Sequence, residues 1–361
     1  MSKIKVGVIG ATGMVGQNYL RLLSNHPWFE VAYLAASPRS AGKSFSEAVA
    51  GRWLMSTPIP EQYKDLVVGD AGNIKEELGK CSIIFSAVNM EKEKIKELEL
   101  AYAGEGFAVV SNNSAHRHTA DVPMLVPEVN HEHTDIIPDQ RRHYGWDTGL
   151  LAVKPNCSVQ SYVTPIHALK EAGYNVDKMI VTTLQAVSGT GYPGPSSYDL
   201  LDNVVPYIGG EEEKSELEPQ KIFGKIEEGR FIHDDSIKIS AHCNRVPVID
   251  GHTACVSIRF QDKKPEINEI IQIWEGFKSL PQRLELPSAP EHPIIVRHEA
   301  DRPQPRRDRD MDKAMAVSVG RLRECNVFDY RFVGLSHNTV RGAAGGAILM
   351  AELLTAEEYI K

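Results

Sequence analysis

The chain has 361 residues, of which 42% are hydrophobic and 24% are charged, and its formal net charge is −8. These proportions are typical of a globular protein of about two domains, and they exclude a disordered tail and a coiled coil. An acidic chain also has no general attraction for nucleic acid or for anionic lipid. We therefore expect no nucleic-acid partner, and we expect any anionic ligand to be held by a few placed cations or backbone N–H groups.

Cysteine spacing and hydropathy bear on the cellular compartment. The five cysteines are odd in number and none forms a Cys-x-x-Cys pair, so we expect no disulfide framework. The apolar run that follows Lys3 and Lys5 is short and interrupted by glycine, unlike the core of a signal peptide. No stretch of about 18 apolar residues is present, so we expect no membrane association. Together these features predict a cytoplasmic protein.

The first part of the chain alternates between strand and helix patterns. A short apolar run at 4–9 leads into a glycine-rich turn, and apolar residues then recur at helical spacing from Val15 onward. Further buried strands are expected at 31–36, 82–88 and 107–111, with a helix at 91–102. This alternation predicts an α/β fold, with a Rossmann-type, doubly wound parallel sheet over residues 1–155.

The second part has a different pattern. A helix is expected at 159–171, followed by strand-like runs and two further helices. This order predicts an α+β domain over residues 156–336 with a mixed, largely antiparallel sheet, which is a candidate subunit interface. An apolar helix within 342–360 is expected to pack back onto the first domain, so that residues 337–361 complete it. The strand-like runs are 179–187, 237–240, 246–249 and 252–260. The two helices are 266–279 and, if Met311 to Val317 is helical, 311–318.

The glycine turn has the spacing Gly10-x-x-Gly13-x-x-Gly16 between a buried strand and a helix. Glycines allow the backbone to approach a pyrophosphate, and the helix N-terminus supplies N–H donors. The turn therefore predicts a dinucleotide site. The alternative is tight packing of helix on strand with no ligand.

The end of the second expected strand indicates which dinucleotide is bound. A site for NAD usually places an acidic residue here for the ribose 2′-hydroxyl, and this chain has none. Ser37, Arg39, Ser40 and nearby Lys43 instead suit a 2′-phosphate. The sequence thus predicts NADP(H) as the cofactor, unless Arg39 is simply a solvated loop residue.

Cys157 lies between a Pro-Asn turn and an expected helix. A helix N-terminus stabilises a thiolate and lowers the thiol pKa, so we expect Cys157 to be a nucleophile. The alternative is a small buried hydrophobic residue, which fits Cys81, Cys255 and Cys325 better.

A nucleophilic cysteine needs a proton-handling partner, and the segment from Arg245 to His252 offers one. Asp250-Gly251 between apolar runs is a hairpin signal, and a two-residue turn there would put Arg245 and His252 on one face of the sheet. A fixed cation beside an imidazole suits acid–base chemistry on an anionic substrate. The alternative is a polar hairpin that faces solvent.

These motifs, weak singly, form a specific set in their order. From residue 4 to about 350 the chain resembles the aspartate-semialdehyde dehydrogenase family, and its Pro-Asn-Cys-Ser form is similar to the branch found in archaea and fungi. The set comprises GVIGATGMVG at 7–16, Arg117 after the fourth strand, VPEVN at 126–130, PNCS at 155–158, QAVSG at 185–189, GEEEK at 210–214 and RVPVIDGH at 245–252.

The resemblance implies a role for each matching residue. It implies that Cys157 is the nucleophile, His252 the general acid/base and Gln185 the residue that orients the acyl group. It implies substrate binding by Arg245, Glu212 (with Glu211 as a near alternative), Lys214, Arg117 and Asn156. It implies cofactor contacts from Gly10, Thr12, Gly13, Met14, Val15, Ser37, Arg39, Ser40, Ser86, Ser188, Gly189, Asn338 and Thr339. No metal is expected, because His131 and His133 have poor spacing for a metal site.

The family reaction reduces L-aspartyl-4-phosphate to L-aspartate-4-semialdehyde with NADPH through a cysteine thioester and releases phosphate, in lysine, threonine and methionine biosynthesis. Relatives are homodimers or homotetramers, which the resemblance implies here, with the second domain catalytic and dimerising. The alternatives are a malonyl-CoA or other acyl-CoA reductase, an N-acetyl-glutamyl-phosphate reductase, or a catalytically silent NADP-binding regulator.

Overall fold

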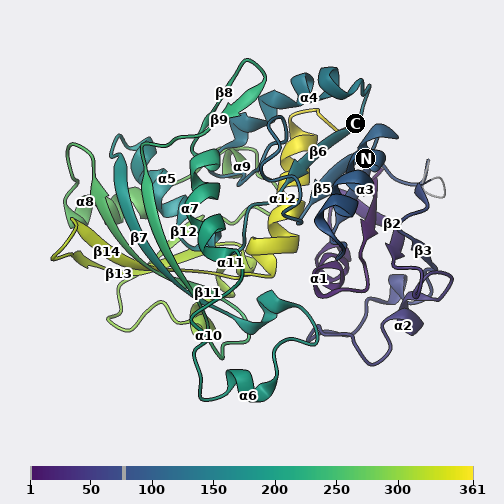
Figure 1. Cartoon of the computed structure of the whole chain (residues 1–361), viewed down its shortest axis with the longest axis horizontal. Helices are drawn as coiled ribbons and strands as arrows, with labels where there is room; N and C mark the ends of the chain where they lie inside the picture. Colours follow the sequence, from purple (N-terminus) through teal and green to yellow (C-terminus); the bar gives the residue numbers. More distant parts are fainter. Residues whose placement is uncertain (1, 75–78, 361) are drawn as a thin grey trace.

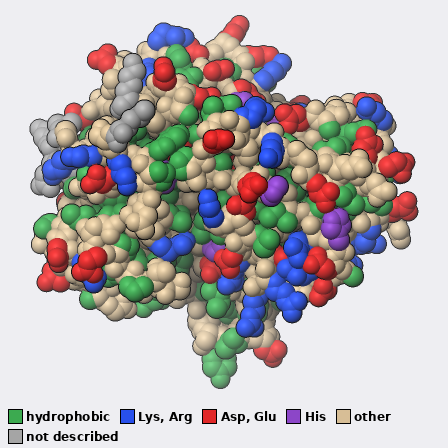
Figure 2. All heavy atoms as spheres, turned by 180° about the vertical axis from the view of Figure 1, so that it is seen from behind, with side chains coloured by type: hydrophobic (Ala, Val, Ile, Leu, Met, Phe, Trp, Pro, Cys, Tyr) green, Lys and Arg blue, Asp and Glu red, His purple; other side chains and the backbone are tan. Residues whose placement is uncertain are grey.

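Two six-stranded sheets organise the chain in a computed structural model that describes residues 2–74 and 79–360. The sheets form two lobes, and the C-terminal helix α12 (Gly345–Ala356) lies between them (Figure 1). Acidic and basic side chains are interspersed on the face of the molecule seen in Figure 2. Within the described ranges, no helix combines the length and apolar character needed to cross a bilayer.

The first sheet is parallel throughout and confirms the predicted Rossmann-type topology. Its strand order is β3-β2-β1-β4-β5-β6, with the topological switch between β1 and β4. In such sheets a ligand binds beyond the carboxyl ends of the strands at this switch. The strands are β1 (Ile4–Ile9), β2 (Phe29–Ala36), β3 (Val68–Asp70), β4 (Ile83–Ser86), β5 (Ala108–Ser111) and β6 (Leu150–Val153).

Side chains of the first sheet alternate between its two faces, as the period of two in a strand requires. Val6 and Val8 pack on one side with Tyr19 of α1 (Met14–Leu23) and Ile348 of α12. Ile84 and its neighbours on the other side pack with α3 (Lys92–Gly104). The expected return of an apolar C-terminal helix to the first sheet is therefore observed.

Two glycines of the N-terminal turn are required by geometry. Gly10 has a φ of +79°, and a Cβ on Gly10 would lie 2.3 Å from the carbonyl oxygen of Ala87. A Cβ on Gly16 would lie 2.3 Å from the carbonyl oxygen of Gly10. The approach of the turn to the backbone after β4 thus explains Gly10, and close packing of α1 on the turn explains Gly16. A Cβ on Gly13 would make only an ordinary contact, 3.4 Å from the carbonyl oxygen of Gly10.

The second sheet is mixed and largely antiparallel, as predicted. Its order is β10-β7-β11-β14-β13-β12, in which the two outermost pairs are parallel and the three inner pairs are antiparallel. Helices α5 (Val163–Glu171) and α8 (Ile267–Gly276) contribute to the core on one face. The strands are β7 (Val176–Gln185), β10 (Lys238–Arg245), β11 (His252–Phe260), β12 (Ile294–Arg297), β13 (Val317–Glu324) and β14 (Tyr330–Ser336).

Helix α7 (Glu211–Ile222) packs against β10 and faces the junction of the two lobes. The remaining elements are short. They are α2 (Phe45–Ala48), η1 (Glu61–Tyr63), η3 (His131–Ile136), α4 (Ile137–Tyr144), η4 (Val159–Ser161), η5 (Val187–Thr190), α6 (Ser197–Leu200), β8 (Lys225–Glu227), β9 (Arg230–Ile232), α9 (Leu280–Arg283), α10 (Pro305–Asp308), α11 (Met311–Ala314) and η6 (Val340–Ala344).

The predicted hairpin at Asp250-Gly251 is wrong. Strands β10 and β11 do not pair with each other, because each pairs with a different edge of β7. The segment 246–249 is no strand; it crosses the end of β7, where Val246 N–H donates to the Gln185 carbonyl and Val187 N–H donates to that of Val248. Pro247 lacks the N–H that a regular ladder needs at this point.

The predicted helix at 311–318 is also wrong beyond its first residues. Asp312 and Lys313 have φ values of +46° and +58°, which a right-handed helix does not contain. Helix α11 ends at Ala314, and β13 begins at Val317. Val317 and Val319 therefore belong to strand β13, and their apolar side chains indicate a buried strand and not a helix.

A buried ion pair ties the start of the C-terminal helical segment to the rest of the molecule. Arg341 donates to both carboxylate oxygens of Glu128, at 2.9 and 3.4 Å, and both side chains are almost fully buried. Arg341 also donates to the carbonyl oxygen of Met315 and to Thr164 Oγ1. The next residue, Gly342, lies against Cys157, so this ion pair fixes the backbone behind that cysteine.

We predict that Arg341→Met lowers the free energy of unfolding by about 3–5 kcal/mol, because it leaves the Glu128 carboxylate buried without its partner. Equilibrium unfolding in urea measures the change. Arg142→Met is the matched control, because Arg142 pairs with Asp139 at the surface and should cost less than about 1 kcal/mol. Equal effects of the two substitutions would contradict the prediction.

Candidate active site

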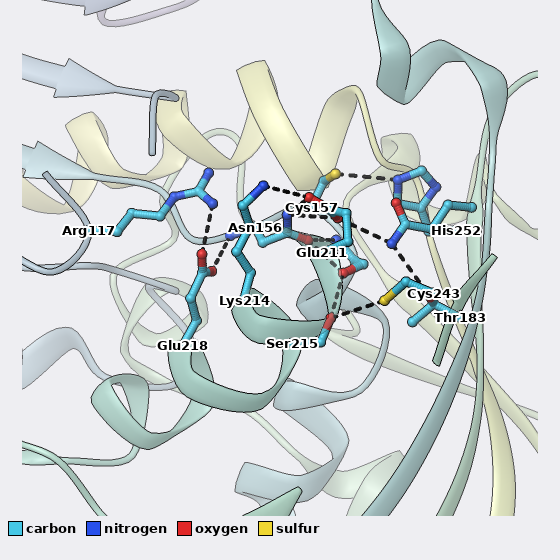
Figure 3. Close-up of polar contacts among 12 residues, drawn as sticks. Arg117, Asn156, Cys157, Thr183, Glu211, Lys214, Ser215, Glu218, Cys243 and His252 are labelled. Atoms are coloured by element: carbon cyan, nitrogen blue, oxygen red, sulfur yellow. Dashed lines mark hydrogen bonds and ion pairs between the residues drawn. The ribbon is translucent and has the colours of Figure 1, made fainter. Parts of the chain in front are cut away.

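Cys157 and His252 meet at the junction of the two lobes (Figure 3). Cys157 Sγ lies 3.3 Å from His252 Nε2, and the histidine is fully buried. Cys157 follows β6 of the parallel sheet, whereas His252 is the first residue of β11 in the other sheet. The two sheets therefore each supply one member of a thiol–imidazole pair.

Register in the second sheet brings the other predicted residues to the same place. Gln185 and Arg245 are direct partners at the ends of the parallel strands β7 and β10. A Cβ on Gly189 would lie 3.2 Å from Arg245 Nη1 and 3.3 Å from His252 Cε1, so Arg245 and His252 are neighbours. The two residues are close, as predicted. The cause is the segment 246–249, which crosses the end of β7, and not a hairpin.

Helix α7 supplies a row of charged side chains to the site. Glu211, Lys214 and Glu218 are three and four residues apart, which places them on one face of the helix. Glu211 accepts hydrogen bonds from Asn156 Nδ2 at 2.8 and 2.9 Å and from Lys214 Nζ at 2.8 Å. Gln185 Nε2 also donates to Glu211, at 3.2 Å. Glu211 is thus the carboxylate at the centre of the site.

Glu212, which the resemblance favoured, lies elsewhere. Its carboxylate accepts a hydrogen bond from the backbone N–H of Cys243 in β10, at 3.1 Å. One residue along a helix turns the side chain by about 100°, so Glu211 and Glu212 cannot both face Asn156. The structure brings the near alternative, Glu211, to the site.

Arg117 is held in place by three parts of the chain. Its Nη1 donates to Glu218 Oε1 at 2.8 Å, and its Nε donates to the carbonyl oxygen of Lys154 at 2.8 Å. Lys221 Nζ donates to the carbonyl oxygen of Arg117, also at 2.8 Å. Glu218 Oε2 accepts from the backbone N–H of Asn156 at 2.5 Å. The arginine and the loop of Cys157 are therefore fixed to one carboxylate.

The expected low thiol pKa is wrong for the unliganded protein. Burial raises the pKa of Cys157 to about 12, and the charge of Glu211 adds to the rise, against the opposing cations Arg117, Arg245 and Lys214. Burial likewise lowers the pKa of His252 to about 3, aided by the positive charge of Arg245. Cys157 precedes a short 3-10 turn, and α5 begins only at Val163. The pair is thus a neutral thiol beside a neutral imidazole.

A cleft of about 880 Å³ runs along the carboxyl ends of the first sheet. It begins at the glycine turn, passes the end of β2 and reaches the segment after η5. Its lining includes these predicted cofactor residues: Gly10, Thr12, Gly13, Met14, Val15, Ser37 and Arg39. Thr190, Gly191 and Tyr192 line the far end. They directly follow Ser188 and Gly189, so the cleft extends toward His252.

The residues present fit a bound NADP. A Cβ on Gly13 would have no neighbour closer than 3.4 Å, which leaves the backbone open to the cleft at the start of α1. A pyrophosphate at this point would meet the N-terminus of that helix. Arg39 and Arg52 line the same cleft, as does Lys94, and they suit the remaining phosphate charge.

Six predicted cofactor residues lie outside the lining of the cleft. Ser86 is fully buried, and its hydroxyl donates to Glu99 Oε1 at 2.7 Å. Asn338 accepts from Gly251 N–H and donates to Ser188 Oγ, both at 2.8 Å. Ser86, Ser188 and Asn338 thus contact the protein, and the cofactor roles of all six residues stay predictions. The six are Ser40, Ser86, Ser188, Gly189, Asn338 and Thr339.

Several residues of the site carried too little signal in the sequence. Glu218 and Lys221 stand in an acidic helix that reads as a solvated surface. Arg52 lies in a loop between short elements, and nothing in the sequence brings it to the glycine turn. Lys94, at the start of the helix after β4, was open to prediction, because residues that follow such strands line the ligand crevice.

Of the two histidines at 131 and 133, His133 serves the fold. His133 is buried and hydrogen bonds to Asn130 Nδ2 at 2.9 Å and to the carbonyl oxygen of Gly224 at 3.0 Å. In the part of the chain that the structure describes, no group of three or more His, Cys, Asp or Glu residues could hold a metal ion.

Comparison with known proteins bears on this geometry directly. Residues 5–137 match the model of the semialdehyde dehydrogenase NAD binding domain, and residues 166–341 match that of the semialdehyde dehydrogenase dimerisation domain. The aspartate-semialdehyde dehydrogenase of Methanothermobacter thermautotrophicus is 46% identical over 97% of this chain and 99% of its own. The chain belongs to the aspartate-semialdehyde dehydrogenase family. The enzyme of Candida albicans is 43% identical over the full length of both chains.

Solved structures of the family share the fold. A crystal structure of aspartate semialdehyde dehydrogenase with NADP from Candida albicans has a TM-score of 0.91 at 42% identity and covers 99% of this chain and 100% of its own. The second enzyme of Vibrio cholerae has a TM-score of 0.76 at 25% identity, with 99% and 100% coverage. The family assignment and its archaeal and fungal similarity, predicted from the motifs, are confirmed.

We predict that alkylation of Cys157 by iodoacetamide in the unliganded protein accelerates about tenfold per pH unit up to about pH 9, because only the thiolate reacts and its pKa is raised to about 12. Mass spectrometry of the peptide measures the rate. Cys325 is the internal control. Burial raises its pKa, but the backbone N–H groups of Phe328 and Val327 outweigh burial and lower it, so its rate should level off at a lower pH. A plateau for Cys157 below about pH 7 would contradict the prediction.

Proposed function

We propose that the protein reduces L-aspartyl-4-phosphate to L-aspartate-4-semialdehyde with NADPH and releases phosphate. Its relatives bear the name aspartate-semialdehyde dehydrogenase, which supports this proposal. The observation that carries the proposal is the thiol–imidazole pair at 3.3 Å beside separate cationic and anionic groups, next to the cleft. A small substrate with a carboxylate, an ammonium and a phosphate would find a partner for each.

Arg245 is proposed to bind the substrate carboxylate, and Glu211 the ammonium. Arg245 is nearly buried beside His252, where a bidentate contact with a carboxylate is strong. Arg117 and Lys214, which Figure 3 shows on the side of Cys157 away from His252, would bind the phosphate together with Asn156. Gln185, which donates to Glu211 in the unliganded protein, is close enough to orient the acyl group once the ammonium binds there.

The sulfur of Cys157 is proposed to attack the acyl phosphate and to expel phosphate, which gives a thioester. Arg117 and Lys214 stabilise the negative charge of the departing group. Bound NADPH supplies a hydride that reduces the thioester to the level of a thiohemiacetal. His252 lies beside the sulfur and serves the carbonyl oxygen, and collapse of the thiohemiacetal releases the aldehyde and regenerates Cys157.

We also propose that the chain assembles as a homodimer or homotetramer and works in the cytoplasm. The match of residues 166–341 to a dimerisation domain supports assembly. Cys157, Cys243, Cys255 and Cys325 are free thiols, which suits a reducing compartment.

If the proposed function is correct, the protein also catalyses the reverse reaction. We predict that it reduces NADP when aspartate semialdehyde and phosphate are both present. Absorbance of NADPH measures it, with malonyl-CoA plus NADPH as the comparison for an acyl-CoA reductase. Cys157→Ser should abolish turnover, because the hydroxyl is a far weaker nucleophile, and should leave the affinity for NADP unchanged. Activity with the CoA thioester alone would overturn the proposal.

The assignment of the ammonium to Glu211 gives a matched pair of variants. We predict that Glu211→Gln raises the KM for aspartate semialdehyde by about tenfold or more, because a charge-assisted contact is lost. Glu212→Gln should change it by less than about twofold, since its carboxylate faces Cys243 N–H in β10. Steady-state kinetics measure both KM values. A larger effect of Glu212→Gln would mean that Glu212, and not Glu211, binds the ammonium.

A further inference from the structure

Lys221, near the end of α7, is a buried lysine to which the proposed reaction gives no role. The residue is 2% exposed, and its Nζ donates to the carbonyl oxygens of Arg117 at 2.8 Å, Thr119 at 2.9 Å and Val122 at 2.8 Å. The ring of Phe231 lies beside the same nitrogen, with its centroid 4.7 Å from Nζ. Three carbonyl groups of one short segment thus converge on one side-chain nitrogen.

This geometry requires the charged form of Lys221. An ammonium has three N–H donors, one for each carbonyl, whereas an uncharged amine has two and would leave one buried carbonyl without a donor. Burial lowers the pKa of Lys221 to about 7, and the carboxylates of Asp121 and Glu218 oppose that effect. Hydrogen bonds to the charged form favour it further, so the segment binds an ammonium.

The segment and the lysine belong to different lobes. Residues 117–122 lie between β5 and β6 of the first sheet and form neither a helix nor a strand, so their carbonyl groups depend on donors from elsewhere. Lys221 comes from α7, which packs against the second sheet. Phe231 of β9, which follows α7, also donates its backbone N–H to the carbonyl oxygen of Ala120 at 3.1 Å. This part of the chain therefore ties the segment to the second lobe.

Helix α7 holds Arg117 at two points. Glu218 Oε1 accepts from the guanidinium at 2.8 Å, and Lys221 donates to the backbone carbonyl of the same arginine at 2.8 Å. Glu218 and Lys221 are three residues apart and share one face of the helix. Neither the side chain nor the backbone of Arg117 can shift without breaking a contact with α7.

The same helix carries Lys214, the second cation that we assign to the phosphate. Lys214 is seven residues before Lys221, which is two turns or about 10 Å along the helix axis. Its Nζ donates to Glu211 at 2.8 Å, so its head group is held as well. Arg117 and Lys214 come from different lobes, and α7 connects them.

We propose that Lys221 is a positioning residue that holds Arg117 at the distance from Lys214 at which both cations bind one phosphate. The inference rests on the proposed function, which assigns the phosphate to these two residues. Lys221 contacts no reacting group and acts through the backbone of Arg117. Its loss therefore weakens phosphate binding and spares the cofactor, because neither α7 nor residues 117–122 line the cofactor cleft.

Binding of inorganic phosphate tests the inference without turnover. Lys221→Met keeps the length of the side chain and removes its three donors. We expect it to raise the Kd for phosphate by about tenfold or more, because a shift of about 1 Å in a binding group has effects up to about 10²-fold. The Kd for NADPH should change by less than about twofold. Phosphorus NMR titration of the full-length protein measures the first constant, and NADPH fluorescence measures the second.

Lys170→Met is the matched control. Lys170 also donates to a carbonyl oxygen, that of Phe223 at 3.4 Å, and its Nζ lies 5.3 Å from the centroid of the Phe223 ring. Its other partner is Asp234, at 2.7 Å, so both of its partners lie outside residues 117–122. We expect the Kd for phosphate to stay within about twofold in this variant.

The outcomes that contradict the inference are specific. An unchanged Kd for phosphate in folded Lys221→Met would overturn it, as would an equal weakening of phosphate and NADPH or no phosphate binding by the wild-type protein. Thermal unfolding shows whether the variant folds. If it does not, Phe231→Leu decides, because it removes only the ring beside the ammonium. We expect it to raise the Kd for phosphate by about threefold, and no change would overturn the inference.

Turnover separates this inference from the proposed function. A wild-type protein that binds phosphate but does not reduce NADP with aspartate semialdehyde would contradict the function, and the phosphate titration would still decide the role of Lys221. In an active enzyme, Lys221→Met should raise the KM for phosphate by about tenfold or more and leave the KM for NADP unchanged. A loss confined to kcat would contradict the positioning role.

Discussion

The arrangement of the site depends on one buried carboxylate, that of Glu218, which is stable only with hydrogen-bond donors at both of its oxygens. Glu218 is fully buried, and its two oxygens accept from Arg117 Nη1 and from the backbone N–H of Asn156. A buried charge without such partners would cost several kcal/mol, so these contacts stabilise helix α7 in this position. Because α7 also presents Glu211 and Lys214, the same contact positions the polar groups of the site relative to the sulfur of Cys157. Each sheet contributes its own residues to the site, and α7 fixes how far apart these two groups of residues lie.

Much of the fold was open to prediction because its signals are local. Apolar runs of strand length and a glycine turn define the parallel sheet, and Gly10 and Gly16 are required by contacts within that one unit. The closeness of Arg245 to His252 was also predictable, but the backbone path that causes it was not. The crossing of 246–249 over the end of β7 depends on where a strand sixty residues earlier in the chain ends. No pattern within the segment itself distinguishes such a crossing from a hairpin.

The site shows the same division. Cys157 and His252 follow from their motifs, and Arg39 and the glycine turn follow from the logic of a dinucleotide site. The choice between Glu211 and Glu212 required the rotation of α7, which packing on β10 decides. The protonation of the cysteine and the histidine required their burial and the charges around them. Sequence indicates which groups react, whereas their proton state arises from the tertiary structure.

The return of α12 to the first sheet has a consequence for biosynthesis. The apolar face formed by Val6, Val8 and their neighbours is closed by Ile348 and other residues of α12. A ribosome synthesises that helix only after it has synthesised every strand of the second sheet. The nucleotide-binding lobe therefore cannot complete its core as an early, independent unit, although domains usually fold in the order of synthesis. During translation its open face must remain shielded from other nascent chains until the closing helix arrives.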